Sequence, residues 1–266
     1  MRPASTTASS TRSTASTRSA TGSSTAARTY ALPADWRRRW ELRRFGFHGL
    51  SFASALPRAA GLLGRPPDPA AGGVGPSGGG SSVCAVHDGR SVWTSMGATP
   101  LEELVMGTRS GSVDPGLLLT LVDAYGLSVK EVRQGLERHS GLLGLSDGRS
   151  SDTRELIPAA ADGDADARLA LEVFAFRARQ GIAEAAVCLD RLDAVIFTGE
   201  IGADQPEVRR AICAGLAALG VDSALEPVVD GDAVVSGADT RVPVVVPTVG
   251  EDLQVAAETR RLLVGA

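Results

Sequence analysis

The sequence lacks any apolar run long enough for a transmembrane helix. No stretch of about 18 consecutive apolar residues occurs in the chain of 266 residues, so we expect no membrane span. Basic charge is not in excess either, because the formal net charge is −4 at pH 7. Nucleic-acid-binding surfaces are usually basic, and we therefore expect no nucleic-acid partner.

Cysteine is scarce and widely spaced. The three cysteines are Cys84, Cys188 and Cys213, and none of them forms a CxxC pair. This spacing excludes a disulfide framework and the usual zinc motifs, and it is typical of a reducing cytoplasm. We expect a cytoplasmic protein in which each cysteine is a small buried apolar residue.

The first 28 residues lack acidic side chains and almost all large apolar ones: MRPASTTASSTRSTASTRSATGSSTAAR. Such a segment cannot bury enough surface to offset its ordering entropy, so we predict disorder. Its Arg-rich, Ser-rich and acid-poor composition also describes an organelle transit peptide. A misread or frame-shifted start of a longer gene is the third interpretation, and the one that we favour.

The stretch from Ala53 to Gly80 contains no apolar run of strand length. Its second half, RPPDPAAGGVGPSGGG at residues 65–80, is dense in proline and glycine. These residues usually interrupt helices and strands, so we predict a loop or a poorly ordered linker.

The remainder has an α/β pattern. Two short apolar stretches flank His87-Asp88-Gly89 and predict a hairpin with an Asp-Gly turn. Buried strands are predicted at 192–197 and 240–248. Helices are predicted at 114–126, 128–141, 165–189, 206–220 and 251–263. Strands that alternate with helices favour a mostly parallel sheet, whose ligands would bind beyond Phe197 and Val246.

A lone arginine stands among small residues in LEELVMGTRSGSVDPG, residues 101–116. The glycines allow a ligand to approach the backbone, and the threonine and serines add hydroxyl donors. The guanidinium of Arg109 is suited to carboxylate or phosphoryl oxygens. The stretch predicts an anion site, although a loop whose arginine pairs with a surface carboxylate fits equally well at this point.

Five blocks together resemble the acetate kinase family, in that family's order and at similar spacing. They are RRFGFHGLS (43–51), SSVCAVHDGRSVWTSMGATPLEELVMGTRSGSVDPG (81–116), SGLLGLSDGRSSDTRE (140–155), DAVIFTGEIGADQPEVRR (193–210) and VPTVGEDLQVA (246–256). The resemblance implies an α/β fold of the actin-like, ribonuclease-H-like superfamily of acetate and sugar kinases. It implies essentially the C-terminal domain at 81–266, with the N-terminal domain missing and 29–80 a remnant of the inter-domain region.

The resemblance also implies a reaction and its residues. The family transfers the γ-phosphoryl group of ATP to acetate with Mg²⁺, and its members form homodimers. Arg109 and His48 match the catalytic positions, although His48 alone also fits a core histidine bonded to backbone. Glu251 matches the magnesium carboxylate and equally suits the first turn of a helix. The nucleotide-binding positions would be Gly78, Gly79, Gly80, Asp152, Thr153, Arg154, Ile201, Gly202, Ala203 and Asp204.

Several positions depart from the family pattern. An early asparagine, a substrate-binding arginine and a catalytic aspartate of the N-terminal domain are absent, and Glu200 and Ala203 replace a glycine and a glutamate. Two alternatives to acetate kinase activity therefore remain open. One is an inactive remnant that binds nucleotide or dimerises, and the other is a kinase for propionate, butyrate or another short-chain carboxylate.

Overall fold

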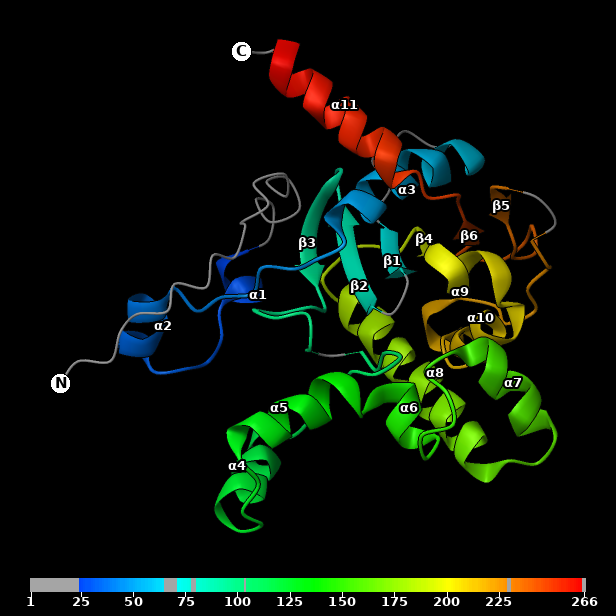
Figure 1. The fold of residues 1–266 in the computed structure, drawn as a ribbon. Helices are drawn as coiled ribbons and strands as arrows, with labels where there is room; N and C mark the ends of the chain where they lie inside the picture. Colours follow the sequence, from blue (N-terminus) through cyan, green and yellow to red (C-terminus); the bar gives the residue numbers. More distant parts are fainter. Residues whose placement is uncertain (1–23, 65–70, 78–79, 103, 229–230, 265–266) are drawn as a thin grey trace.

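A computed structural model describes residues 24–64, 71–77, 80–102, 104–228 and 231–264 (Figure 1). The predicted disorder at 1–28 falls mostly outside these residues, and only its end is described, as a short helix α1, Thr25–Arg28. Within the described part of the chain, no helix is both long and apolar enough to cross a membrane.

The centre of the molecule is a sheet in the order β3-β2-β1-β4-β6-β5. Its strands are β1 Ala71–Ser77, β2 Gly80–His87, β3 Arg90–Thr94, β4 Ala194–Phe197, β5 Ala233–Val234 and β6 Val244–Val246. Pairs β1–β4 and β4–β6 are parallel, and the other three pairs are antiparallel. The prediction of a mostly parallel sheet is therefore wrong, because strands that pair antiparallel with their neighbours are added at both edges.

The predicted Asp-Gly hairpin is confirmed. Asp88 and Gly89 have φ values of 50° and 66° and join β2 to β3. Positive φ at both central residues matches the right-handed twist of the strands that the turn connects.

The prediction of a loop or linker from Ala53 to Gly80 is wrong in two places. Helix α3 spans Gly49–Leu62 with Pro57 inside it, and β1 occupies Ala71–Ser77. Phe52, Ala55 and Ala59 recur at helical spacing on the buried face of α3. Strand β1 forms because β2 and β4 pair with its two edges, so residues on both sides of the expected domain boundary at 80/81 share one sheet.

The five helices predicted at 114–126, 128–141, 165–189, 206–220 and 251–263 are present, whereas the other helices were not predicted from periodicity. Asp114, Ser128 and Asp164 each cap the helix that follows, by accepting a backbone N–H. The remaining helices are α2 Ala34–Trp40, α4 Pro115–Asp123, α5 Val129–Arg138, α6 Gly141–Leu145, α7 Thr153–Ala161, α8 Ala165–Ala186, α9 Gly199–Asp204, α10 Pro206–Cys213, the 3₁₀ turn Ala217–Leu219 and α11 Glu251–Val264.

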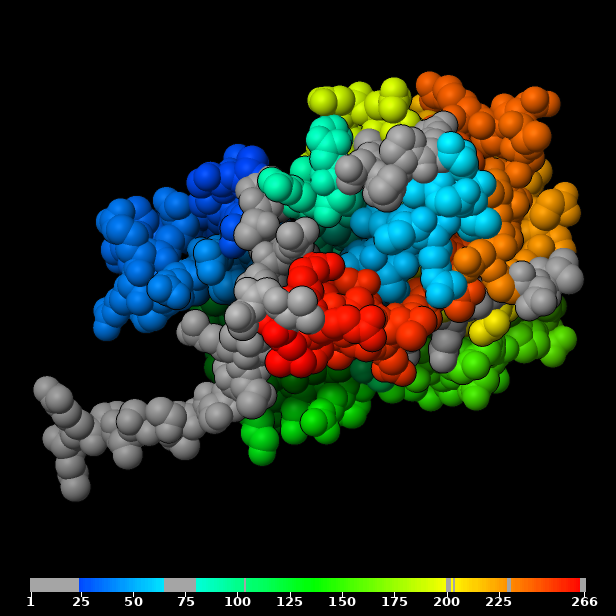
Figure 2. Space-filling model, turned by 90° about the horizontal axis from the view of Figure 1, so that it is seen from above, coloured from blue at the N-terminus to red at the C-terminus, as the bar shows by residue number. Residues whose placement is uncertain are grey.

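The core lies on both faces of the sheet because alternate strand residues point to opposite sides. In β4, Val195 and Phe197 join the larger core formed with α8, whereas Ala194 and Ile196 pack with Ala59 of α3. Helix α11 contacts the outer side of α3, and the two lie side by side in Figure 2, α11 in red and α3 in cyan. The sheet is thus held between α8 and α3.

The expectation for the cysteines holds for two of the three. Cys84 and Cys213 are buried, whereas Cys188 is exposed just beyond the end of α8. Its thiol donates a weak hydrogen bond to the carbonyl of Glu184, 3.3 Å away.

Candidate anion and nucleotide site

His48 lies where α3 meets the centre of the sheet. It immediately precedes the first turn of α3 with φ 59°, a left-handed conformation that few non-glycine residues adopt. Its Nδ1 lies 2.8 Å from Oγ of Ser82 in β2. Burial lowers the pKa of His48, Glu251 opposes this shift, and Arg109 adds to it. The ring is therefore oriented by the sheet and favoured in its neutral form.

Gly80 brings His48 and Arg109 together at the start of β2. A Cβ atom on Gly80 would lie 3.2 Å from Nε2 of His48 and 3.6 Å from Nη1 of Arg109. Because Gly80 has no side chain, the His48 imidazole and the Arg109 guanidinium both lie next to its backbone. Gly78 and Gly79, the other members of the predicted phosphate loop, lie outside the described residues.

Arg109 sits on a loop that is anchored at both sides. Its Nη1 donates to the carbonyl of Pro100 at 3.2 Å and to Sδ of Met106 at 3.6 Å. The neighbouring amide of Ser110 donates to the carbonyl of Leu136 at 2.9 Å. Within the described residues Arg109 pairs with no carboxylate, which favours the anion-site interpretation over the surface ion pair.

The Arg109 loop depends on Gly141, the first residue of α6. Gly141 has φ 67°, and a Cβ atom there would lie 2.2 Å from the carbonyl oxygen of Met106 and 2.8 Å from that of Arg109. Any larger residue would push the loop away from α6. This packing explains why the loop needs a glycine that lies outside its own motif.

Glu251 begins α11 on the same side of the sheet as His48. Its Oε1 accepts a hydrogen bond from Oγ of Ser51 in α3, and the amide of Gly250 donates to Oγ of Ser54 at 3.3 Å. The described residues contain no group of three or more metal-ligating side chains. A single carboxylate nevertheless fits Mg²⁺, which takes one or two carboxylates and fills its remaining positions with water and phosphate oxygens.

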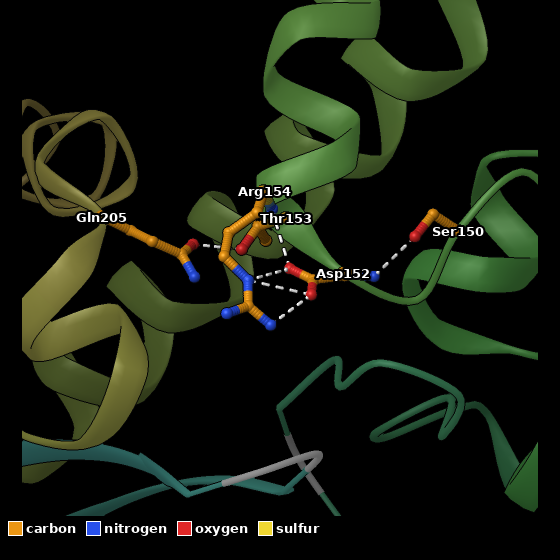
Figure 3. A network of polar contacts seen from close by, with 5 residues as sticks. All are labelled: Ser150, Asp152, Thr153, Arg154 and Gln205. Carbon is orange, nitrogen blue, oxygen red and sulfur yellow. Dashed lines mark hydrogen bonds and ion pairs between the residues drawn. The ribbon is translucent and has the colours of Figure 1, made fainter.

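Asp152, Thr153 and Arg154 start α7, and Figure 3 shows their contacts. The carboxylate of Asp152 accepts from the Arg154 amide at 2.8 Å and from its guanidinium at 2.6 to 3.0 Å. The Arg154 hydrogen bonds lower the pKa of Asp152. The Oγ of Thr153 donates to the buried side-chain carbonyl of Gln205, so this hydroxyl links the start of α7 to the residue that follows α9.

The third predicted nucleotide segment, Ile201 to Asp204, lies in α9 directly after β4. A Cβ atom on Gly202 would lie 2.8 Å from the carbonyl oxygen of Phe197, so the helix can pass this close only with glycine. Fully buried Arg209 donates to the carbonyl of Gly202. The Thr153–Gln205 bond then connects this helix end to the start of α7, which brings two of the three predicted nucleotide segments together.

Four supporting residues were missed by the sequence analysis: Ser51, Ser82, Gln205 and Arg209. Ser82 and Ser51 belong to blocks quoted for the resemblance, but serine in such a block carries no signal of its own. Gln205 and Arg209 also lie in a quoted block, residues 193–210, and Gln205 directly follows the predicted Ile201–Asp204 loop. Burial of an arginine such as Arg209 cannot be read from composition, because most arginines are exposed.

Comparison with known proteins identifies the class and then the family. The fold is that of the acetate and propionate kinases. Acetate kinase from Porphyromonas gingivalis superposes with a TM-score of 0.84 at 32% identity, covering 91% of this chain and 61% of that one. Propionate kinase from Francisella tularensis superposes with a TM-score of 0.80 at 35% identity, covering 89% and 60%.

The family model described as the acetokinase family matches residues 16–257, and the chain belongs to this family. Acetate kinase from Deinococcus deserti is 44% identical over 237 residues, which are 88% of this chain and 59% of the relative. The Deinococcus radiodurans acetate kinase is 45% identical over 240 residues, which are 89% of this chain and 60% of that relative. The chain thus spans about 60% of the length of the relatives that it matches.

Proposed function

We propose that this chain is an acetate kinase-like phosphotransferase that converts ATP and acetate, with Mg²⁺, into ADP and acetyl phosphate. The observation that carries the proposal is the meeting of Arg109, His48 and Gly80 at the start of β2, on the side of the sheet that also bears Glu251. Phosphoryl transfer needs positioning and charge stabilisation far more than covalent chemistry, and this constellation offers both.

Each side chain has a distinct task in this proposal. The Arg109 guanidinium neutralises charge on the transferring phosphoryl oxygens through its planar set of donors. Burial lowers the pKa of His48, which favours its neutral form. When Ser82 donates to Nδ1 of His48, Nε2 carries the proton and points a donor toward the same oxygens. The backbone at Gly80 lets the phosphates approach closely.

The proposed cofactors are ATP and Mg²⁺. Glu251 would hold the metal, directly or through water, and the metal would supply positive charge to the phosphate oxygens. Gly78, Gly79 and Gly80 would surround the phosphates. The adenosine would lie between the start of α7, at Asp152 to Arg154, and α9, at Ile201 to Asp204. The Thr153–Gln205 bond between these two elements supports one continuous nucleotide site.

The carboxylate substrate is proposed as acetate or a similar short-chain acid. The similarity to a propionate kinase structure at 35% identity makes propionate the acid to compare directly with acetate. We further propose a cytoplasmic homodimer. The wide spacing of the cysteines supports the location, and the solvent-exposed α4 supports an additional partner surface.

The test is hydroxamate-coupled detection of the acyl phosphate, acetyl phosphate from acetate or propionyl phosphate from propionate, with the purified full chain, ATP and Mg²⁺. We expect turnover that Arg109→Ala reduces about 100- to 1000-fold, the size of effect seen when one charge-stabilising donor is lost. Arg133→Ala is the matched control, because this arginine is exposed on α5 with a single long contact to Glu137.

ATP binding is measured in parallel by calorimetry. Binding without turnover would contradict the proposed reaction and favour a nucleotide-binding remnant. Turnover that is unchanged in Arg109→Ala would contradict the role of the Arg109 loop. Absence of both binding and turnover would contradict the proposed function altogether.

A further inference from the structure

A polar cluster outside the proposed reaction connects the two segments that carry His48 and Arg109. At its centre is the carboxylate of Glu102. Its Oε1 accepts from Nη2 of Arg44 at 2.7 Å, and its Oε2 accepts from the hydroxyl of Tyr30 at 2.5 Å. The Arg44 and Glu102 side chains are only 18% and 30% exposed, which strengthens their interaction relative to a surface pair.

The cluster forms hydrogen bonds to the backbone of the loop between β3 and the Arg109 segment. Arg44 also donates to the carbonyls of Thr94 and Ser95, and the amide of Ala98 donates to the Tyr30 hydroxyl at 2.8 Å. Burial and the hydrogen bond to Glu102 raise the pKa of Tyr30 to about 12, so the phenol stays a donor at neutral pH. Backbone groups of the loop are thus held by side chains from an earlier part of the chain.

Gly97 makes room for the cluster. A Cβ atom at this position would lie 1.5 Å from Oε2 of Glu102 and 2.0 Å from the Tyr30 hydroxyl oxygen. Real Cβ atoms do not approach other atoms this closely, so the arrangement requires glycine. The sequence places this glycine at the point where Tyr30 and Glu102 meet.

This loop contacts the segment that carries His48 and the side chain of Arg109. On one side, the carbonyl of Gly97 accepts from the amide of Phe45, three residues before His48. On the other side, the carbonyl of Pro100 accepts from Nη1 of Arg109 at 3.2 Å. A displacement of this loop would therefore move the Arg109 guanidinium relative to the His48 segment.

We propose that Glu102 is a positioning residue, which acts with Tyr30 and Arg44 to fix the distance between the His48 segment and the Arg109 guanidinium. Its importance for phosphoryl transfer rests on the proposed function. Its effect on the Arg109 position does not, and can be measured without ligand or turnover. A misplacement of a charged group by about 1 Å can cost on the order of 100-fold in rate.

Methionine methyl NMR offers a direct readout. The chain has three methionines, and Sδ of the fully buried Met106 lies 3.6 Å from Nη1 of Arg109. With ¹³C-methyl methionine, the Met106 signal is assigned with Met106→Leu and calibrated with Arg109→Ala. We expect Glu102→Ala to move the Met106 signal toward its position in Arg109→Ala. In the double variant Glu102→Ala/Arg109→Ala, the Met106 signal should lie at its position in Arg109→Ala, because no guanidinium remains to be displaced.

The matched control is Glu137→Ala, which removes an exposed carboxylate paired at 4.0 Å with Arg133 and should leave the Met106 signal unchanged. A Met106 signal at its wild-type position in folded Glu102→Ala would overturn the proposal. The proposal would also be overturned if the Met106 signal of the double variant differed from that of Arg109→Ala by the full shift that Glu102→Ala causes alone. The effect of Glu102 would then not pass through Arg109.

A second variant covers the case in which Glu102→Ala does not fold. Tyr30→Phe removes the hydroxyl that donates to Oε2 of Glu102 and accepts from the Ala98 amide. The Glu102 carboxylate stays in place, and the same two outcomes of the Met106 signal decide. In an active chain, Glu102→Ala should also lower kcat/KM about 10- to 100-fold. If neither the wild-type chain nor any variant forms acyl phosphate, the proposed function fails. The Met106 methyl signals still decide whether Glu102 positions Arg109.

Discussion

At the scale of single residues, the site depends on positions where side chains are either absent or held in unusual conformations. His48 has φ 59°, and Gly141 has φ 67°. Such conformations cost about 1–3 kcal/mol each for non-glycine residues and persist only where the surrounding structure enforces them. For His48, the contact with Ser82 and the following turn of α3 provide that enforcement.

The raised pKa of Tyr30 predicts how the stability of the fold changes at alkaline pH. Its pKa is raised from 10.0 to about 12, first by burial and then by the bond to Glu102. A group whose pKa is higher in the folded state contributes stability that is complete below pH 10 and is lost as pH rises through about 12. We expect the free energy of unfolding in urea to decrease across this window, and to decrease less in Tyr30→Phe.

Tyr125→Phe is the control for this measurement, because Tyr125 is the other tyrosine of the chain and is 70% exposed. Its pH dependence should follow that of the wild type. An identical alkaline slope for Tyr30→Phe and wild type would show that the Tyr30 phenol is not coupled to folding.

At the scale of elements, sequence patterns predicted five helices well, missed the other helices and predicted the central strand poorly. The capped helices at Ser128 and Asp164 carry their signals locally, in a polar N-cap followed by apolar periodicity. Strand β1 has no such signal, since AGGVGPS offers a single large apolar side chain. It is specified by pairing with β2 and β4, and Pro76 lies beyond Val74, the last residue paired with β4.

The candidate site shows the same division. The resemblance named His48, Arg109 and Gly80, and the structure places them together, while their roles stay predictions. The contacts that hold them could not be predicted, because Ser82, Gln205 and Arg209 act through burial and through partners distant in sequence. Short motifs identify reacting groups, whereas the supporting groups emerge only from tertiary packing.

The hydrogen bond between Thr153 of α7 and Gln205, which lies between α9 and α10, predicts the effect of substitutions on stability. Thr153 and Gln205 are 4% and 3% exposed and bond to each other. Gln205→Leu leaves the Thr153 hydroxyl buried without its acceptor, which should cost about 1–3 kcal/mol of unfolding free energy. Thr153→Val/Gln205→Leu removes both polar partners and should be more stable than Gln205→Leu alone.

Urea denaturation of the two single variants and the double variant completes this cycle. Gln180→Leu, on the exposed side of α8, is the matched control and should stay within about 0.5 kcal/mol of wild type. Additive effects of the Thr153 and Gln205 substitutions would contradict a specific bond between the two elements.

At the scale of the whole molecule, α4 and α5 form a hairpin at the edge of the body, away from the sheet (Figure 1). Neither helix contains a buried residue, although α4 reads PGLLLTLVD. Leu119 and Leu117 are 65% and 47% exposed, and Tyr125 and Val129 at the turn are 70% and 66% exposed. Apolar side chains gathered on one projecting element are typical of an interaction surface.

The proposed homodimer gives this surface an occupant and makes the last prediction. We expect the wild-type chain to have the mass of a dimer in light scattering, and Leu119→Glu to shift it toward the monomer, because a charge buried in an apolar interface is costly. Leu169→Glu is the matched control, since Leu169 on α8 is 47% exposed and lies outside the hairpin. If Leu119→Glu keeps the wild-type mass, or if Leu169→Glu dissociates equally, the dimer does not form through α4. A monomeric wild type at micromolar concentration would contradict the homodimer itself.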